Sequence, residues 1–302
     1  MRPLLITLDA FNTLITPRLP IPAQYASSAA KHNIPLSAST LQPAFRSSFK
    51  ALSASHPNYG RELALRGDYA GPRQWWEDVI RGCFERALRE NDSPDLRGKA
   101  VPDALVEDLL DRFASKRGYR LFDDVGPFLK AVRAQSRKVV IGVVSNSDDR
   151  ISSVLDSLGV SVRDARAGEE KTASGHDLPG FEGERETKTA QDQHREQNDI
   201  DFILTSYQVG AEKPDPLIWD VATRTANRLA GESGSGTGPD GWECIHIGDD
   251  YGKDYRGAGN AGWGAYYLAR DAEAAAQAPE GTRVITSLLD LLPKLGASDS
   301  QQ

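Results

Sequence analysis

Residues 4–8 read LLITL, and Asp9-Ala10-Phe11-Asn12-Thr13-Leu14 follows them directly. A short apolar run without polar alternation is typical of a strand that is buried on both faces of a sheet. In parallel α/β sheets, ligands gather at the carboxyl ends of the strands. Asp9 is therefore a candidate nucleophile, because a carboxylate can attack phosphorus and form an aspartyl phosphate.

Three further segments repeat this arrangement of an apolar run followed by polar side chains. Ser145 lies in VVSNS and offers a hydroxyl to a phosphate oxygen at the start of a predicted helix. Lys213 lies in GAEKPDP and supplies a positive charge that can bridge nucleophile and phosphate. Asp249, in HIGDD, and Asp254 behind it offer the carboxylate oxygens that Mg²⁺ prefers.

Each motif also has an ordinary structural interpretation. A lone Asp at a strand end is usually a turn or a helix cap, and Ser-Asn-Ser before Asp148 is compatible with an N-cap. A Lys before Pro214 is usually a solvated loop residue, and Gly248-Asp249-Asp250 is compatible with a turn. Taken singly, each favours structure; four in this order, each behind a strand, favour one shared site.

Apolar runs of strand length alternate with helical patterns from residue 119 onward. Strands are predicted at 139–144, 202–205, 244–247 and 265–268, and helices at 125–135, 150–158, 216–228 and 285–295. This order predicts a parallel sheet covered by helices on both faces. The strand at 4–8 belongs to the same sheet, so we expect an α/β core formed by residues 1–17 and 118–302.

Residues 18–117 are predicted to form a helical unit inserted after the first strand. Apolar residues recur there at helical spacing, over 25–32, 41–53, 73–90 and 102–115. Within the core, residues 163–199 lack large apolar side chains and are predicted to be a disordered insertion. The Gly- and Ser-rich residues 231–241 are predicted to be a flexible loop.

The composition of the 302 residues limits the classes of partner. A net charge of −7 without a basic stripe argues against nucleic-acid binding. No run approaches the ~20 apolar residues that span a bilayer, and the first strand leaves no room for a targeting segment before it. Cys83 and Cys244 are expected to be buried thiols, and His246 a hydrogen-bonded core residue. We expect a cytoplasmic or nuclear protein that binds a small molecule; the sequence does not indicate its oligomeric state.

Together the four motifs resemble those of the haloacid dehalogenase (HAD) superfamily with an inserted helical cap of the C1 type. The chain is most similar to the group called haloacid dehalogenase-like hydrolase domain-containing protein 3. HPNYG at 56–60, RQWW at 73–76 and HIGDDY at 246–251 carry this closer resemblance. The resemblance covers nearly the whole chain outside 163–199 and 231–241. It implies a doubly wound, Rossmann-like core, a cap that opens and closes over the site, and Mg²⁺ as cofactor.

The resemblance also implies roles for single residues. Asp9 is the nucleophile, and Mg²⁺ is held by Asp9, the backbone carbonyl of Phe11 and Asp249, with Asp254 orienting the metal's waters. Ser145 and Lys213 hold the transferring group.

Thr13 and Asn146 are expected near the substrate, with Thr13 stabilising the loop after Asp9. In the cap, Asn58 and Arg73 are candidate substrate ligands with Tyr59, although exposed cap surface is a nearly equal alternative. Trp75 and Trp76 are candidate pocket residues, and at least one of them is expected to pack in the core.

Phe11 departs from the phosphatase pattern, which has a second Asp there as general acid. General acid–base catalysis typically contributes ~10²–10⁴ in rate, so its loss should slow an ordinary phosphatase. Dehalogenating members of the superfamily also lack that acid, but they lack the metal-binding Gly-Asp pair as well. This chain has that pair, as Gly248-Asp249. Three functions stay open, ranked in this order: a Mg²⁺-dependent, phosphatase-like hydrolase weakened by Phe11, a non-catalytic binding protein, and a metal-independent dehalogenase-type hydrolase.

Overall fold

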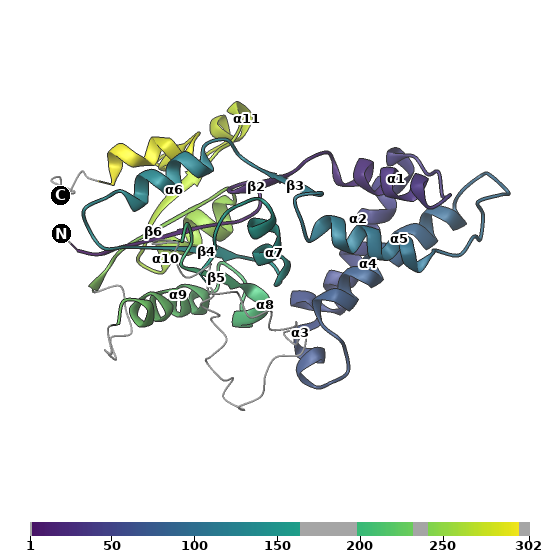
Figure 1. Ribbon diagram of the computed structural model, residues 1–302, viewed down its shortest axis with the longest axis horizontal. Helices are drawn as coiled ribbons and strands as arrows, with labels where there is room; N and C mark the ends of the chain where they lie inside the picture. The colour runs from purple at the N-terminus through teal and green to yellow at the C-terminus, as the bar shows by residue number, and fades with distance from the viewer. Residues whose placement is uncertain (1, 164–197, 232–240, 296–302) are drawn as a thin grey trace.

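A six-stranded parallel sheet forms the centre of the computed structural model, which describes residues 2–163, 198–231 and 241–295. The sheet has the strand order β5-β4-β1-β6-β7-β8. Its strands are β1 (Leu4–Leu8), β4 (Val139–Ser145), β5 (Phe202–Thr205), β6 (Glu243–Gly248), β7 (Gly264–Leu268) and β8 (Val284–Ile285). Helices cover both faces of the sheet, and further helices extend from one side of it (Figure 1). The predicted α/β fold class is confirmed.

Alternate residues of the first strand pack on opposite faces of the sheet. Leu4, Ile6 and Leu8 belong to one buried cluster, whereas Leu5 belongs to the other. The first cluster includes residues of α6 (Val125–Arg133), α7 (Arg150–Ser157) and the 3₁₀ helix η5 (Leu288–Lys294). The second includes residues of α9 (Pro216–Leu229) and α10 (Gly257–Asn260). Burial on both faces explains why the strand reads as a continuous apolar run.

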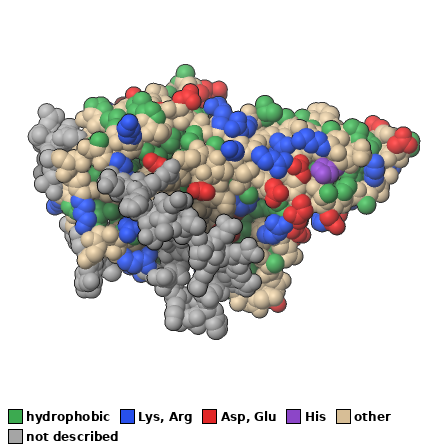
Figure 2. Space-filling model, in the orientation of Figure 1, with side chains coloured by type: hydrophobic (Ala, Val, Ile, Leu, Met, Phe, Trp, Pro, Cys, Tyr) green, Lys and Arg blue, Asp and Glu red, His purple; other side chains and the backbone are tan. Residues whose placement is uncertain are grey.

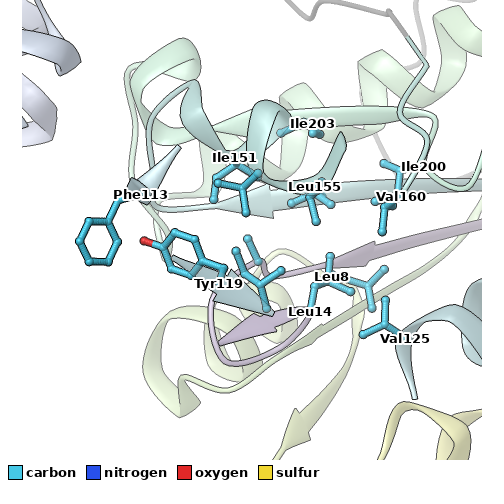
Figure 3. Close-up of a cluster of buried hydrophobic side chains, with 14 of the residues drawn as sticks. Leu8, Leu14, Phe113, Tyr119, Val125, Ile151, Leu155, Val160, Ile200 and Ile203 are labelled. Carbon is cyan, nitrogen blue, oxygen red and sulfur yellow. The ribbon is translucent and has the colours of Figure 1, made fainter. Parts of the chain in front are cut away.

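The first cluster continues from the sheet into the helical unit. Leu8 and Leu14 pack among residues of α6 and α7, and Phe113 and Tyr119 lie at the far end of the same group (Figure 3). The rings of Phe113 and Tyr119 meet edge to face, with centroids 5.8 Å apart. One apolar cluster therefore joins the two parts of the molecule.

A two-stranded antiparallel ribbon connects the inserted helices to the core. It pairs β2 (Ile15–Pro17) with β3 (Tyr119–Leu121), and the inserted helices lie between them in the chain. These are α1 (Ile21–Lys31), α2 (Ala38–Ser55), α3 (Pro57–Leu65), α4 (Pro72–Arg89) and α5 (Asp103–Phe113). The four predicted helical segments correspond to α1, α2, α4 and α5, whereas α3 and the ribbon were not predicted. The cap limits 18 and 117 stay predictions.

The helix predicted over 285–295 is wrong at its start and in its type. Ile285 ends the short strand β8, where it pairs with Leu268. A 3₁₀ helix then begins behind Ser287, whose hydroxyl accepts a hydrogen bond from the Leu289 backbone N–H. Pro293 lies inside that helix and has no backbone N–H, so it cannot continue a regular α-helical ladder.

The remaining features are the cysteines, the two polar segments within the core, the membrane-spanning potential of the helices and the surface charges. Cys83 and Cys244 are buried free thiols, as predicted. The predicted insertion at 163–199 and loop at 231–241 lie almost entirely outside the described residues. No helix in the described part of the chain combines the length and the apolarity needed to cross a membrane. Acidic and basic side chains lie next to one another over the cap helices (Figure 2), and Arg81 pairs there with Asp103.

A substitution of Gly142 in β4 tests the packing of the sheet. A Cβ at this position would lie 2.2 Å from a ring atom of Phe202, its neighbour on β5. We expect Gly142→Ala to lower the free energy of unfolding by about 1–3 kcal/mol, the usual cost of overpacking a core. Gly126→Ala in α6 is the matched control, because no heavy atom lies within 4 Å of its added Cβ. Chemical denaturation measures both; equal stability of the two variants would contradict this packing.

Candidate functional site

The ammonium of Lys213 joins three segments at the carboxyl edge of the sheet. Its Nζ lies 2.7 Å from Asp9 Oδ1, 2.6 Å from Asp254 Oδ1 and 2.8 Å from the carbonyl oxygen of Val144. An ammonium has three N–H donors, so each donor has an acceptor. The residue is only 3% exposed. Burial of this charge is tolerable because it is fully hydrogen-bonded and paired.

Sheet order explains why these groups meet. Asp9 follows β1, Val144 lies in β4, and Asp254 lies in the π-helix η4 (Tyr251–Arg256) behind β6. Strands β4 and β6 flank β1 on its two sides, so their carboxyl ends lie next to Asp9. Lys213 comes from the loop after the short helix α8 (Ser206–Val209). The structure therefore brings together the four motifs that the sequence singled out.

Asn146 holds the backbone that carries Lys213. Its Oδ1 accepts a hydrogen bond of 2.6 Å from the Lys213 N–H, and its Nδ2 donates one of 2.9 Å to the Lys213 carbonyl. Both ends of the amide are thus engaged with one peptide segment. Ser145, the residue before it, ends β4 and is buried. The described contacts of Asn146 position the lysine, and its predicted role as a substrate ligand stays a prediction.

Three carboxylates form a tight group beside the lysine. Ligand oxygens of Asp9, Asp249 and Asp254 all lie within 4.8 Å of one another. The Nδ2 of Asn12 donates a hydrogen bond of 3.1 Å to Asp249 Oδ2. Asn12 has a left-handed backbone, with φ of 53°, which Asn tolerates better than most residues. Asn12 was not predicted as a site residue, although its place inside the first motif was a usable signal.

Gly248 allows Asp254 to lie against the end of β6. A Cβ on Gly248 would lie 2.2 Å from Asp254 Oδ2 and 2.6 Å from its Cβ. Asp254 Oδ2 accepts a hydrogen bond from the Asp250 N–H at 2.9 Å. On its other side, His246 Nε2 lies 3.2 Å from Asp254 Oδ1, and His246 Nδ1 lies 2.8 Å from Thr7 Oγ1. The prediction of a hydrogen-bonded core histidine is confirmed.

Burial and mutual repulsion raise the pKa values of two of the three carboxyls. Burial raises the pKa of Asp9, and Asp254 adds to this effect while Lys213 opposes it. Burial, followed by repulsion from Asp9, raises the pKa of Asp249 to about 6. Burial acts in the same direction on Asp254, but Lys213 and His246 outweigh it and lower its pKa. Although burial opposes it, attraction to Asp9 and Asp254 raises the pKa of Lys213, which stays charged.

This group of residues fits a divalent cation. Three ionised carboxylates and one ammonium carry a net charge of −2, which one divalent ion would neutralise. Oxygen donors at this spacing suit Mg²⁺, a hard cation that keeps several waters. Asp9, Asp249 and Asp254 would hold it, while the carbonyl of Phe11 stays a predicted ligand. The raised pKa values of Asp9 and Asp249 agree with this, because a nearby cation would stabilise the ionised form of both carboxyls.

Thr13 contributes to the loop after Asp9 through its backbone. Its side chain is fully buried, and its hydroxyl has no hydrogen-bond partner among the described residues. Its backbone carbonyl instead accepts a hydrogen bond of 2.5 Å from Arg270 Nη2. Arg270 is fixed in turn by an ion pair of 2.6 Å with Asp124. The loop is therefore held through its backbone, and a Thr13 contact with substrate stays a prediction.

Asn58 and Tyr59 connect the inserted helices to the core. Asn58 Nδ2 donates to the Ser206 carbonyl at 2.8 Å, and its Oδ1 accepts from the Ser206 hydroxyl at 2.9 Å. The Tyr59 hydroxyl donates to the Asn146 carbonyl at 3.4 Å. Both residues have left-handed backbones, with φ of 46° and 59°. This turn directs two successive side chains toward the edge of the sheet that carries the site.

Arg73 and Trp75 have structural partners within the inserted helices. The Arg73 guanidinium is mostly exposed and forms ion pairs of 3.5 Å with Glu77 and 2.6 Å with Glu107. These contacts give no support to the prediction that Arg73 binds substrate, because α5 supplies its closer partner. Trp75 is buried and donates a hydrogen bond to the His56 carbonyl, so at least one of the two tryptophans packs in the core, as predicted.

Comparison with known proteins finds relatives that match most of the chain. No family model matches the chain. An uncharacterised hydrolase of Schizosaccharomyces pombe is 29% identical over 263 residues, which cover 87% of this chain and 89% of the relative. Haloacid dehalogenase-like hydrolase domain-containing protein 3 of Mus musculus is 29% identical over 302 residues, covering 96% and 93%. Over nearly its whole length the chain is similar to HAD-like hydrolases, at 27–29% identity. It is a distant relative of both proteins.

Solved structures agree with this fold. A HAD phosphatase from Thermococcus onnurineus superposes with a TM-score of 0.52 at 19% identity, over 97% of this chain and 98% of that one. The HAD-like hydrolase YfnB from Bacillus subtilis, solved bound to magnesium, gives 0.52 at 15% identity over 98% and 100%. A defluorinating L-2-haloacid dehalogenase gives 0.54 at 19% identity over 97% and 95%. At these identities the likeness shows the HAD-like fold and leaves the reaction undecided.

A second polar cluster lies on the cap side of this HAD-like core. Arg150 forms a two-pronged ion pair with Asp148, at 2.8 Å and 2.9 Å. The Trp76 indole donates a hydrogen bond of 2.7 Å to Asp148, and the Arg150 guanidinium stacks 4.1 Å above the Trp76 ring. Sequence reasoning missed this cluster, because Asp148 and Arg150 look like an ordinary helix start and Trp76 is distant in the chain.

Asp149, beside this cluster, gives a pH prediction. Burial and then Asp148 raise its pKa from 3.8 to about 6, so the folded state binds this proton more tightly than the unfolded chain. Its contribution to stability is therefore greatest below about pH 4 and falls as the pH rises through 6. We expect Asp149→Asn to raise the free energy of unfolding at pH 7 by about 1–2 kcal/mol, allowing for partial exposure.

Denaturation at pH 4 and pH 7 measures this effect. The gain should vanish at the lower pH, where Asp149 is already protonated. Asp156→Asn on the exposed side of α7 is the control and should change little at either pH. A loss of stability in Asp149→Asn at pH 7 would contradict the raised pKa.

Proposed function

We propose that this protein is a Mg²⁺-dependent, phosphatase-like hydrolase that acts on a small phosphorylated compound through an aspartyl intermediate on Asp9. The contact of Lys213 with both Asp9 and Asp254, beside the carboxylate of Asp249, supports this proposal most strongly. A candidate nucleophile, a fixed positive charge and three candidate metal ligands thereby lie within one small volume. Such positioning and charge stabilisation supply most of the catalysis in phosphoryl transfer.

In the proposed reaction, a free oxygen of Asp9 attacks phosphorus while Lys213 holds the other. The bond between phosphorus and the leaving oxygen breaks, and that oxygen carries away the electron pair. Water then attacks the phosphorus of the aspartyl phosphate, and the bond between phosphorus and the Asp9 oxygen breaks, with its electron pair returning to the Asp9 carboxylate. The water's protons leave on the released phosphate. Lys213 stabilises the charge on the transferring group through its fixed positive charge, which its three hydrogen bonds to Asp9, Asp254 and the Val144 carbonyl hold in place. When bound, Mg²⁺ would supply further positive charge beside the phosphoryl oxygens.

Phe11 determines which leaving groups suit this site. Its side chain has no titratable group, and its ring packs 5.6 Å from that of Tyr119. No proton donor therefore stands at this position for the departing oxygen. The reaction should favour leaving groups that are stable as anions.

Two other functions are ranked below this one. A non-catalytic binding protein is second, because Phe11 lacks the acid while Lys213 and the carboxylates remain assembled. A metal-independent, dehalogenase-type hydrolase is third. Displacement of a halide needs no proton, but it would leave the clustering of Asp249 with Asp9 without a purpose.

Removal of one carboxylate tests the metal site. Asp249→Asn should weaken Mg²⁺ binding at least tenfold, because it removes one of three charged ligands. Calorimetric titration compares it with the wild type and with Asp220→Asn, a partly exposed carboxylate that pairs with Arg224 on α9. Equal affinity in all three proteins, or binding in none, would remove the metal from the proposed function.

Restoring an acid at position 11 tests the reaction. We expect the wild type to cleave aryl phosphates in preference to alkyl phosphates, because an aryl oxide leaves more readily as an anion. Phe11→Asp should raise the rate on alkyl phosphates at least tenfold; this is below the ~10²–10⁴ typical of general acid–base catalysis, because the added charge lies near the metal ligands. Phe11→Asp combined with Asp9→Asn is the control and should be inactive.

Two outcomes of this assay would change the conclusion. Rapid cleavage of alkyl phosphates by the wild type would mean that another residue donates the proton. A folded, Mg²⁺-binding Phe11→Asp variant without activity would favour the binding protein.

A further inference from the structure

A cavity lies between the inserted helices and the core, beside the proposed reaction site. Its volume is about 350 Å³, at the lower end of the ~300–1,000 Å³ typical of small-molecule sites. Phe11 and Asn146 form part of its wall on the core side. Phe11 follows the nucleophile Asp9 by two residues, and Asn146 is hydrogen-bonded to the backbone of Lys213. The cavity therefore begins next to the groups that would hold a phosphoryl group.

Apolar and aromatic side chains dominate the wall of this cavity. Of its fifteen described lining residues, eight are aromatic and only Asn146 and Arg150 are strongly polar. Helices α1, α2, α4 and α5 all contribute, for example through Ile21, Phe45 and Ile80. Contact between such a surface and an apolar ligand group lowers the free energy of binding. A hydroxyl-rich ligand would lose its hydrogen bonds to water there without replacing them.

The cavity offers no free charge to a ligand. Arg150 is the one lining residue in the described chain that carries a full charge, and Asp148 neutralises it through two hydrogen bonds. Burial raises the pKa values of Tyr25, Tyr59 and Tyr119, so these phenols stay protonated and neutral. A second anionic group on the ligand would therefore meet no unpaired cation here.

We propose that the substrate is a phosphate monoester or acyl phosphate whose leaving group carries, beyond the departing oxygen, an uncharged, apolar body of about ring size that binds in this cavity. The inference rests on the proposed phosphohydrolase function and names its substrate class. Phe11 contributes to both aspects of this specificity. It forms part of the apolar wall, and it leaves the departing oxygen without an acid, which suits the stable anions that aryl and acyl phosphates release.

The affinities of two phosphonates test whether the cavity binds an apolar ring, independently of how readily a leaving group departs. Phenylphosphonate and methylphosphonate carry the same ionisable group on a phosphorus–carbon bond that this reaction does not cleave. Calorimetric titration of the wild type in Mg²⁺ should show at least tenfold tighter binding of phenylphosphonate, the gain expected from burying a phenyl ring. The comparison needs no turnover and no variant.

A filling variant tests whether the cavity is the binding site. Ile21 is partly buried and lines the cavity, so Ile21→Trp should reduce the preference for phenylphosphonate at least fivefold and leave methylphosphonate binding unchanged. Leu65→Trp is the matched control, because Leu65 is 39% exposed on α3 and does not line this cavity. Circular dichroism and thermal melting establish that both variants fold.

The outcomes distinguish this inference from the function on which it rests. Equal affinity for the two phosphonates overturns the inference and leaves the proposed function intact. Absence of binding by either phosphonate overturns both. A folded Ile21→Trp variant that keeps the full preference shows that the ring binds elsewhere, and this also overturns the inference.

Discussion

The site depends on the burial of one ammonium among three acceptors. Lys213 contacts Asp9, Asp254 and a carbonyl of β4, so it joins segments that are far apart in the chain. Without that charge, two carboxylates would lie close together in a region of low dielectric, where their repulsion is strong. Asn146 maintains the arrangement by holding both polar groups of the Lys213 backbone. The requirement for full pairing thus fixes the positions of the nucleophile and of one metal ligand together.

The inserted helices complete the surroundings of this charge pair. They reach the core through the Asn58–Ser206 hydrogen bonds and through Trp76, which donates to Asp148. The helices supply most of an apolar wall, and Phe11 contributes to it from the core side. Phe11, two residues after Asp9, therefore lines an apolar cavity close to the charged, hydrogen-bonded group. This arrangement favours a ligand with one anionic end and one apolar end.

The sequence predicted five of the six strands of the main sheet, because burial within the sheet leaves continuous apolar runs of four to seven residues. It also predicted that the site motifs lie together at one edge of the sheet, because ligands bind at the carboxyl ends of parallel strands. The ribbon of β2 and β3 escaped prediction, since strands of three residues are too short to show a period. The helix expected over 285–295 failed because pairing of Ile285 with Leu268 is a long-range contact.

What the sequence determined by itself was the α/β alternation, the inserted helices, the absence of a titratable group at Phe11 and the clustering of Asp249 with Asp254 behind one strand. The spacing of apolar residues, the residue types in turns and the order of the motifs along the chain contain that information. Only the tertiary structure decided which acceptors Lys213 uses, that Asn58 and Asn146 bond to backbone, and that Arg73 pairs with Glu107. Those choices depend on packing between segments distant in the chain, because a polar side chain takes whichever partner the fold brings within about 3 Å.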